Sequence, residues 1–243
     1  MENLFITEYF DWPLASRSPR VRLANSVLAK LGYGARLRGP QHTGIMTNCE
    51  QRMNMYHLLS QVLAYGVPGH VVELGCNEGQ SSVLMRKVLD NLAPERDLHV
   101  YDSFEGLPEA RAKDGRIPFG AHDLKVPKDI LIDNFKRYSL RLPEIHEGWF
   151  NETLPTGLPD QICFAHLDGD LYESILTSLI YVYPRLSKGA ICLIDDYADP
   201  AIHNGWNQLP GVKKACDEFL AGKPERVSLL YAGDYSHGFF RKL

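Results

Sequence analysis

The chain has 243 residues, of which 44% are hydrophobic and 23% charged, an ordinary globular composition that excludes a mainly disordered protein. The formal net charge of −4 argues against a protein held to nucleic acid by phosphate contacts. The length favours one α/β domain with additions over two separate domains.

Features that would target or anchor the chain are absent from the sequence. The longest apolar run, at residues 190–194, is too short for a membrane span, and the start MENLFITEYFDWPL lacks the regions of a signal peptide. The five cysteines form no CxxC pair, and Cys163 and Cys192 lie within apolar runs, as reduced core residues do. We therefore expect a cytoplasmic protein.

The N-terminal part is expected to differ from the rest. Residues 1–45 are interrupted by prolines and glycines and should form an extension, with a short helix over 23–31, that packs on the domain or on a second subunit. A longer helix is expected from about residue 47 to 65, because Gly66 and Pro68 would end it.

Residues 46–243 alternate between predicted strands and helices. Short apolar runs predict strands at 70–75, 98–102, 144–146, 162–168 and 189–196. Two further strands are expected around the turn AGDYS at 232–236. Helices are expected at 79–92, 129–138, 172–186 and 209–222. This order predicts an α/β fold with a Rossmann-like, doubly wound, mostly parallel sheet of seven strands.

Ligands of such sheets sit beyond the carboxyl ends of the strands. The first strand ends in Glu73, Gly75 and Gly79, spaced as ExGxxxG and not as the phosphate-binding GxGxxG. This glycine turn suits a nucleoside with an amino-acid tail, such as S-adenosylmethionine (SAM); the alternative is an ordinary tight turn. Asp102 ends the second strand, where a carboxylate can accept both ribose hydroxyls.

Four carboxylates follow the fourth and fifth strands: Asp168, Asp170, Asp195 and Asp196. Carboxylates clustered at one sheet edge repel one another unless they bind protons or a cation. Oxygen ligands favour Mg2+, or else Mn2+ or Ca2+, over Zn2+. We therefore expect Asp168, Asp195 and Asp196 to bind a metal ion. The alternative for Asp195 and Asp196 is a helix cap followed by a surface acid.

Several motifs, in this order along the chain, resemble those of the macrocin O-methyltransferase family. They are VELGCNEG, DSFEGLP, HEGWF, HLDGDLYES and LIDDY, all between residues 44 and 200. Members of this family are SAM- and Mg2+-dependent enzymes that methylate sugar hydroxyls on antibiotics. The resemblance implies the class I methyltransferase fold, SAM and Mg2+ as cofactors, a small glycosylated acceptor and a homo-oligomer.

The resemblance also assigns roles to individual residues. It implies that Asp168, Asp195 and Asp196 complete the metal site, with Asp168 nearest the acceptor hydroxyl. The residues that it places around SAM are Glu73, Gly75, Gly79, Ser81, Ser82, Asp102, Ser103, Gly148, Trp149, Phe150 and Asp168. Asp168 is the first candidate for the catalytic base, and Asp170 and His203 are the alternatives.

The expected reaction is in-line methyl transfer to a hydroxyl whose pKa is lowered by the metal ion. The long polar segment 103–128 is expected to act as a lid. His70, His99 and His166 lie beside or within strands and are expected to be structural.

Other classes of protein are less consistent with these motifs. A catechol- or phenol-type O-methyltransferase usually has a lysine three residues after its first metal acid, and this chain has Leu171 there. A non-catalytic SAM-binding module would have little use for four acids at the other strand ends. An NAD-dependent dehydrogenase is disfavoured because the third glycine of its fingerprint is displaced.

Overall fold

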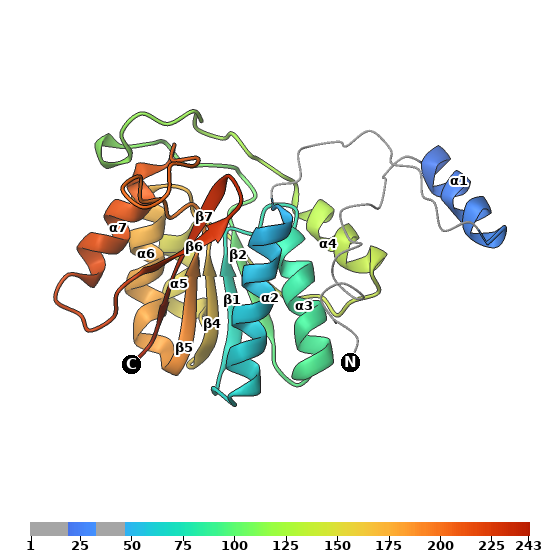
Figure 1. Cartoon of the computed structure of the whole chain (residues 1–243), viewed down its shortest axis with the longest axis horizontal. Coiled ribbons are helices and arrows are strands. Elements are labelled where there is room, and N and C mark those ends of the chain that lie inside the picture. Colours follow the sequence, from blue (N-terminus) through green and yellow to red (C-terminus); the bar gives the residue numbers. More distant parts are fainter. Residues whose placement is uncertain (1–18, 33–46) are drawn as a thin grey trace. The chain divides into compact units, whose positions relative to one another are not determined.

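The computed structural model describes residues 19–32 and 47–243 (Figure 1). The chain divides into a first unit, up to Cys49, and a second unit from Glu50 to Leu243. In the first unit, helix α1 (Pro19–Lys30) covers most of the short helix expected at 23–31 and begins earlier, because proline is well accepted in a first helical turn. The rest of the expected extension lies outside the described residues.

The second unit is built on a seven-stranded sheet with the order β3-β2-β1-β4-β5-β7-β6. The strands are β1 (His70–Leu74), β2 (Leu98–Asp102), β3 (Glu144–Glu147), β4 (Ile162–Leu167), β5 (Leu186–Ile194), β6 (Ser228–Ala232) and β7 (Tyr235–Arg241). β7 runs in the direction opposite to the other six strands. The predicted Rossmann-like sheet is confirmed, and its strand order reverses between β1 and β4, where such sheets bind ligands.

Six helices accompany the sheet, with α2, α3 and α4 on one face and α5, α6 and α7 on the other (Figure 1). They are α2 (Cys49–Ala64), α3 (Gln80–Leu92), α4 (Lys128–Arg137), α5 (Phe150–Gly157), α6 (Tyr172–Val182) and α7 (Pro210–Leu220). Two 3-10 turns, η3 (Ala112–Asp114) and η4 (Tyr183–Arg185), complete the unit. None of the described helices is long and apolar enough to cross a membrane.

The main difference from the sequence prediction is α5, which was not expected. Its sequence FNETLPTG contains Pro155 inside the helix, and an internal proline normally argues against helix. The helix begins nevertheless, because the Glu152 carboxylate accepts a hydrogen bond from the backbone N–H of Trp149 at its N-cap (3.4 Å). The helix that was predicted to run to 186 ends at Val182, and Pro184 lies in the 3-10 turn that follows.

The core lies along the central strands. All six residues of β4 are buried, and so are four of the five residues of β1. Parallel strands covered by helices on both faces are apolar for this reason. Cys163 and Cys192 are fully buried, which confirms that they are core residues. The polar exceptions in this core, Glu73 and His166, belong to the site described next.

Candidate active site

The loop between β1 and α3 passes directly against the end of β4. Gly75 and Gly79 have φ angles of 88° and 78°, which glycine adopts without strain. A Cβ at Gly75 would lie 1.8 Å from the carbonyl oxygen of Asp168. The Asp168 N–H donates to the Leu74 carbonyl (2.8 Å). The glycine loop and the first acidic residue therefore meet through backbone atoms, which accounts for the glycine at position 75.

Asp102 fastens this loop to the end of β2. Its Oδ2 accepts hydrogen bonds from the N–H groups of Cys76 (2.9 Å) and Asn77 (3.0 Å), and its Oδ1 accepts one from Phe104 (2.7 Å). Two carboxylate oxygens offer about four acceptor positions, so one remains at Oδ1 for a ligand. Ser103 instead forms a local turn, in which its hydroxyl accepts the Glu105 N–H (3.1 Å).

Glu73 and Ser82 lie beneath the loop and not on its surface. Both are fully buried, and the Ser82 hydroxyl donates to Glu73 Oε2. Glu73 Oε1 lies 3.0 Å from Nδ1 of His166 on the neighbouring strand. Ser81 is also buried. Glu73 and Ser82 thus support the glycine loop from below, and the sequence motif alone does not reveal this.

Three carboxylates come together beyond β4 and β5. Asp168, Asp170 and Asp196 each place an oxygen within 4.8 Å of the others. Asp170 and Asp196 have φ angles of 58° and 54°, a strained conformation for residues with a Cβ. Strain of this kind is maintained where the surroundings impose a specific geometry.

The electrostatics of this cluster favour a cation. Burial first, and the negative charge of Asp195 second, raise the pKa of Asp168 and Asp196 well above the ordinary value. The same causes raise the pKa of Asp170 to about 7. A hard divalent ion among these oxygens would remove the repulsion, so the donor set fits Mg2+.

Asp195 has a different environment from the other three. Its Oδ1 accepts hydrogen bonds from Gln51 Nε2 (3.1 Å) and the Asp196 N–H (3.0 Å), and it lies 3.0 Å from His237 Nε2. His166 Nε2 lies 3.9 Å from Oδ2. Burial opposes ionisation, but the charges of His237 and His166 outweigh it and hold the pKa of Asp195 below its ordinary range. Oδ2 is therefore the oxygen left for a metal ion.

Aromatic residues from the predicted cofactor segment lie beside the cluster. A Cβ at Gly169 would lie 3.3 Å from the Phe150 ring, so this ring contacts the turn between Asp168 and Asp170. The Gly148 N–H donates to the Asp102 carbonyl (2.9 Å).

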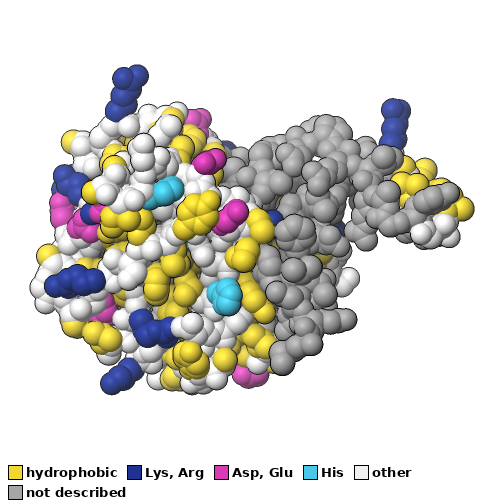
Figure 2. Space-filling model, viewed as in Figure 1, with side chains coloured by type: hydrophobic (Ala, Val, Ile, Leu, Met, Phe, Trp, Pro, Cys, Tyr) yellow, Lys and Arg dark blue, Asp and Glu magenta, His cyan; other side chains and the backbone are white. Residues whose placement is uncertain are grey.

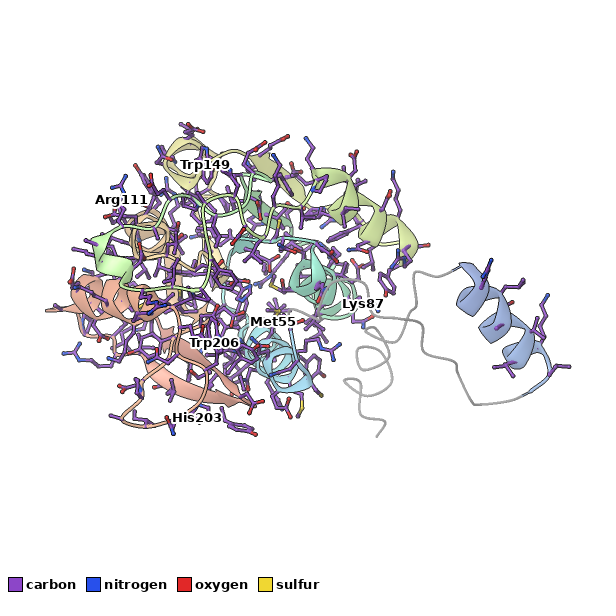
Figure 3. The ribbon with its side chains drawn as sticks, turned by 90° about the horizontal axis from the view of Figure 1, so that it is seen from above. Met55, Lys87, Arg111, Trp149, His203 and Trp206 are labelled. Atoms are coloured by element: carbon purple, nitrogen blue, oxygen red, sulfur yellow. The ribbon has the colours of Figure 1, made fainter. Side chains whose placement is uncertain are left out.

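His203 is not part of the carboxylate cluster. Its ring packs edge-on against Tyr231, with centroids 6.0 Å apart. Figure 3 shows His203 at the margin of the domain, on the side away from Trp149. The described residues that form the cluster are acids and His166, so the geometry leaves Asp168 and Asp170 as the candidate bases.

Several hydrogen bonds fasten the segment 103–128. The Leu107 N–H donates to the Asp123 carbonyl (2.9 Å), which closes the ends of the segment. In the middle, the buried Asp114 carboxylate accepts hydrogen bonds from the N–H groups of Tyr172 (2.6 Å) and Arg111 (2.7 Å). Figure 1 shows the segment running above the carboxyl edge of the sheet. Its middle is thus attached to the start of α6, directly after Asp170.

Sequence reasoning missed several residues of the site. His237 and Gln51 carry no motif, and their contact with Asp195 depends on which strand and helix lie beside β5. His166 was interpreted as structural, and it is buried, but it also lies between Glu73 (3.0 Å) and Asp195 (3.9 Å). Burial lowers the pKa of His166, while the hydrogen bond and charge of Glu73 outweigh that effect and raise it.

The sheet order, the glycine loop at the strand switch and the acids beyond β4 and β5 define a class I methyltransferase. A family model described as macrocin-O-methyltransferase (TylF) matches residues 32–219. The chain belongs to this macrocin-O-methyltransferase family and is an O-methyltransferase, which confirms the resemblance found in the sequence.

Individual relatives agree with this assignment. The chain is 37% identical, over 71% of its length and 69% of the relative's, to the 8-demethyl-8-(2,3-dimethoxy-alpha-L-rhamnosyl)-tetracenomycin-C 4'-O-methyltransferase of Streptomyces olivaceus. It is 31% identical, over 75% of its length and 70% of the relative's, to the demethyldecarbamoylnovobiocin O-methyltransferase of Streptomyces niveus. The solved structure of the O-methyltransferase NovP superposes with a TM-score of 0.71 at 27% identity, covering 95% of this chain and 91% of the other.

Proposed function

We propose that this chain transfers the methyl group of SAM to a hydroxyl oxygen of a sugar on a small glycosylated molecule, with the help of Mg2+. The observation that carries this proposal is the group of close carboxylates beside the glycine loop, at the point where the strand order reverses. The name of the Streptomyces olivaceus relative, which acts on a rhamnosyl compound, supports a sugar acceptor.

The chain's own residues would bind and orient the cofactor. Gly75 and Gly79 let the loop approach it closely, and Asp102 has one acceptor position left for a ribose hydroxyl. Phe150 contacts the turn between Asp168 and Asp170, where an apolar ring excludes water from the reacting groups.

Asp168 and Asp196 would hold the Mg2+, together with Oδ2 of Asp195. When bound, the ion would lower the pKa of the acceptor hydroxyl and fix its orientation. Asp168, our first candidate for the base, lies next to the cofactor loop and accepts the hydroxyl proton; Asp170 is the alternative in the same cluster.

Calorimetric titration tests both half-sites. SAM and Mg2+ are titrated separately into the wild type and into the double variant Asp195→Asn/Asp196→Asn. We expect micromolar SAM binding in both proteins and loss of Mg2+ binding in the variant alone. Absence of SAM binding to the wild type contradicts the proposal. SAM binding without any Mg2+ binding contradicts its metal part and points to a phenol or acid acceptor.

We also propose a homo-oligomer, as the family resemblance implies. Figure 2 shows hydrophobic side chains on the face that includes α2. Met53 of that helix and Tyr231 of β6 are exposed. Light scattering on the purified protein measures the mass directly, and a mass of 27.5 kDa, that of one chain, contradicts this part of the proposal.

A further inference from the structure

A row of buried polar side chains crosses the sheet beneath the candidate site. Ser82 at the start of α3 donates to Glu73 on β1, and Glu73 lies 3.0 Å from Nδ1 of His166 on β4. On its other side, Nε2 of His166 lies 3.9 Å from Asp195 Oδ2, and Asp195 Oδ1 lies 3.0 Å from Nε2 of His237 on β7. The row therefore runs from the glycine loop to Asp195 and His237, and its widest step is the 3.9 Å between His166 Nε2 and Asp195 Oδ2, which is an ion-pair distance and not a hydrogen bond.

The backbone register explains why these side chains meet. Glu73 pairs with His166, and His166 pairs with Leu193. Side chains two residues apart on a strand share a face, so Asp195 follows Leu193 on the side of His166. His166 is fully buried, and each of its ring nitrogens faces a different carboxylate. The hydrogen bond with Glu73 holds the ring in one orientation, which leaves Nε2 facing Asp195 without a hydrogen-bond partner among the described residues.

We propose that His166 is a positioning residue that links the two half-sites, so that SAM and the divalent ion each strengthen the binding of the other. A ligand that orders the glycine loop would also fix Glu73 beneath it, and His166 would pass that restraint to Asp195. Ordering one end of a rigid row lowers the entropy cost of ordering the other end. This inference rests on the proposed function.

Two substitutions separate the two contacts of His166. The amide nitrogen of asparagine lies about where Nδ1 of histidine does. His166→Asn therefore keeps a nitrogen that can contact Glu73 and loses the nitrogen that faces Asp195. The amide of glutamine reaches the position of Nε2, so His166→Gln favours the contact with Asp195 over the contact with Glu73. A matched control is His99→Gln on the neighbouring strand β2, because His99 contacts His70 and His146 and, among the described residues, not the row.

The measurement is the Mg2+ dissociation constant, by calorimetry, with and without saturating SAM. In the wild type and in His99→Gln, we expect SAM to tighten Mg2+ binding by roughly 5-fold or more, the usual lower range of such coupling. In His166→Asn and His166→Gln, both ligands should still bind, and this ratio should fall to about 1. In turnover, kcat should fall more than KM rises.

Three results would overturn the inference. A ratio of about 1 in the wild type shows that the half-sites are independent, while leaving the proposed function intact. If both His166 variants keep the wild-type ratio, the two half-sites are coupled by another path. Failure of the wild type to bind SAM removes the proposed function and the inference with it. If neither variant folds, Ser82→Ala breaks the row at its α3 end, and an unchanged ratio in that variant contradicts the inference.

Discussion

The two edges of the sheet both gather titratable side chains, and they balance charge in opposite ways. At the carboxyl edge, Asp168, Asp170 and Asp196 crowd together, and within the described part of the chain none of them pairs with a lysine or arginine. At the amino edge, His70 and Asp97 lie in a cluster of the same size. The cluster at the carboxyl edge has unbalanced negative charge, and the cluster at the amino edge does not.

The amino edge satisfies its own groups. Asp97 pairs with Arg141 (3.1 Å) and lies 3.5 Å from His70, while its backbone N–H donates to the His70 ring (3.1 Å). His99 shares a hydrogen bond with His146 (3.2 Å). Burial, followed by the charge of His146, lowers the pKa of His99 and keeps it neutral. These side chains satisfy one another's charges and hydrogen bonds, so they need no bound ligand.

The difference shows how a functional cluster can be told from a structural one. Proximity of acids and histidines is common to both edges, so proximity alone does not discriminate. Raised carboxylate pKa values and strained backbone occur together at the carboxyl edge, where no lysine or arginine among the described residues pairs with the acids. The tests that follow are ordered by the size of the effect we expect.

The largest effect is expected from Asp168→Asn. This change removes a metal ligand and the first candidate base while preserving size, so turnover should fall by roughly 1,000-fold, equivalent to about 4 kcal/mol of transition-state stabilisation. SAM affinity, measured by calorimetry, should stay within a few-fold because the backbone contact of Asp168 with the loop is kept. An unchanged rate would show that the carboxyl edge is not the reacting site.

Removal of divalent ions should make stability depend on pH. The folded pKa of Asp170, about 7, exceeds its ordinary value of 3.8, so the folded state binds more protons between these values. Stability of the ion-free protein should therefore decrease as pH rises from about 4 to about 7. Thermal unfolding in EDTA at pH 5 and pH 8 measures this, and saturating Mg2+ should reduce the difference. Asp170→Asn is the control, and an equal slope in that variant would contradict the explanation.

A smaller effect is expected from Asp114→Ala, which removes the hydrogen bond from the Tyr172 N–H at the start of α6, while the contact of Lys113 Nζ with the Tyr172 hydroxyl (2.6 Å) remains. Loss of a buried carboxylate that accepts two backbone hydrogen bonds should cost about 2 kcal/mol locally. Limited proteolysis within the segment should accelerate roughly 10-fold or more, and kcat/KM should fall. Glu109→Ala, at an exposed position of the same segment, is the control, and its segment should be cleaved at the wild-type rate.

SAM tests the lid prediction in the same assay. Binding of SAM should slow cleavage of the wild-type segment, because an ordered lid is a poor protease substrate. Cleavage at the same rate with and without SAM would remove the lid interpretation, while the anchoring by Asp114 would stand.

The smallest effect is expected at the amino edge. His99→Gln replaces a neutral imidazole with a neutral amide, so activity should stay within about 2-fold and unfolding free energy within about 1 kcal/mol of the wild type. Activity and thermal unfolding measure both. A loss of activity near that of Asp168→Asn would erase the distinction between the two edges.

Most of the fold was predictable, because most of the strands are short apolar runs bounded by a glycine, an acid or a turn. The exception, α5, was hidden by Pro155, and its N-cap depends on the local geometry of Trp149 and Glu152. The strand ends that carry the site were equally visible in the sequence, since the parallel topology brings those ends to one edge.

The contacts across the sheet were not predictable. His237 meets Asp195 only because β7 inserts between β5 and β6. No periodicity in the sequence states which strand lies beside which. Glu73 and Ser82 belong to the right motif, but their burial beneath the loop depends on packing against His166.

The contact of Gly75 with the Asp168 carbonyl has a consequence for the engineering of this enzyme. Because the two chemical halves meet through main-chain atoms, their alignment does not depend on the side chains that surround the acceptor. The residues that contact the acceptor can therefore be varied while the junction of β1 and β4 stays fixed. Even alanine at position 75 would push the two strand ends apart, so Gly75 must be kept in any engineered variant.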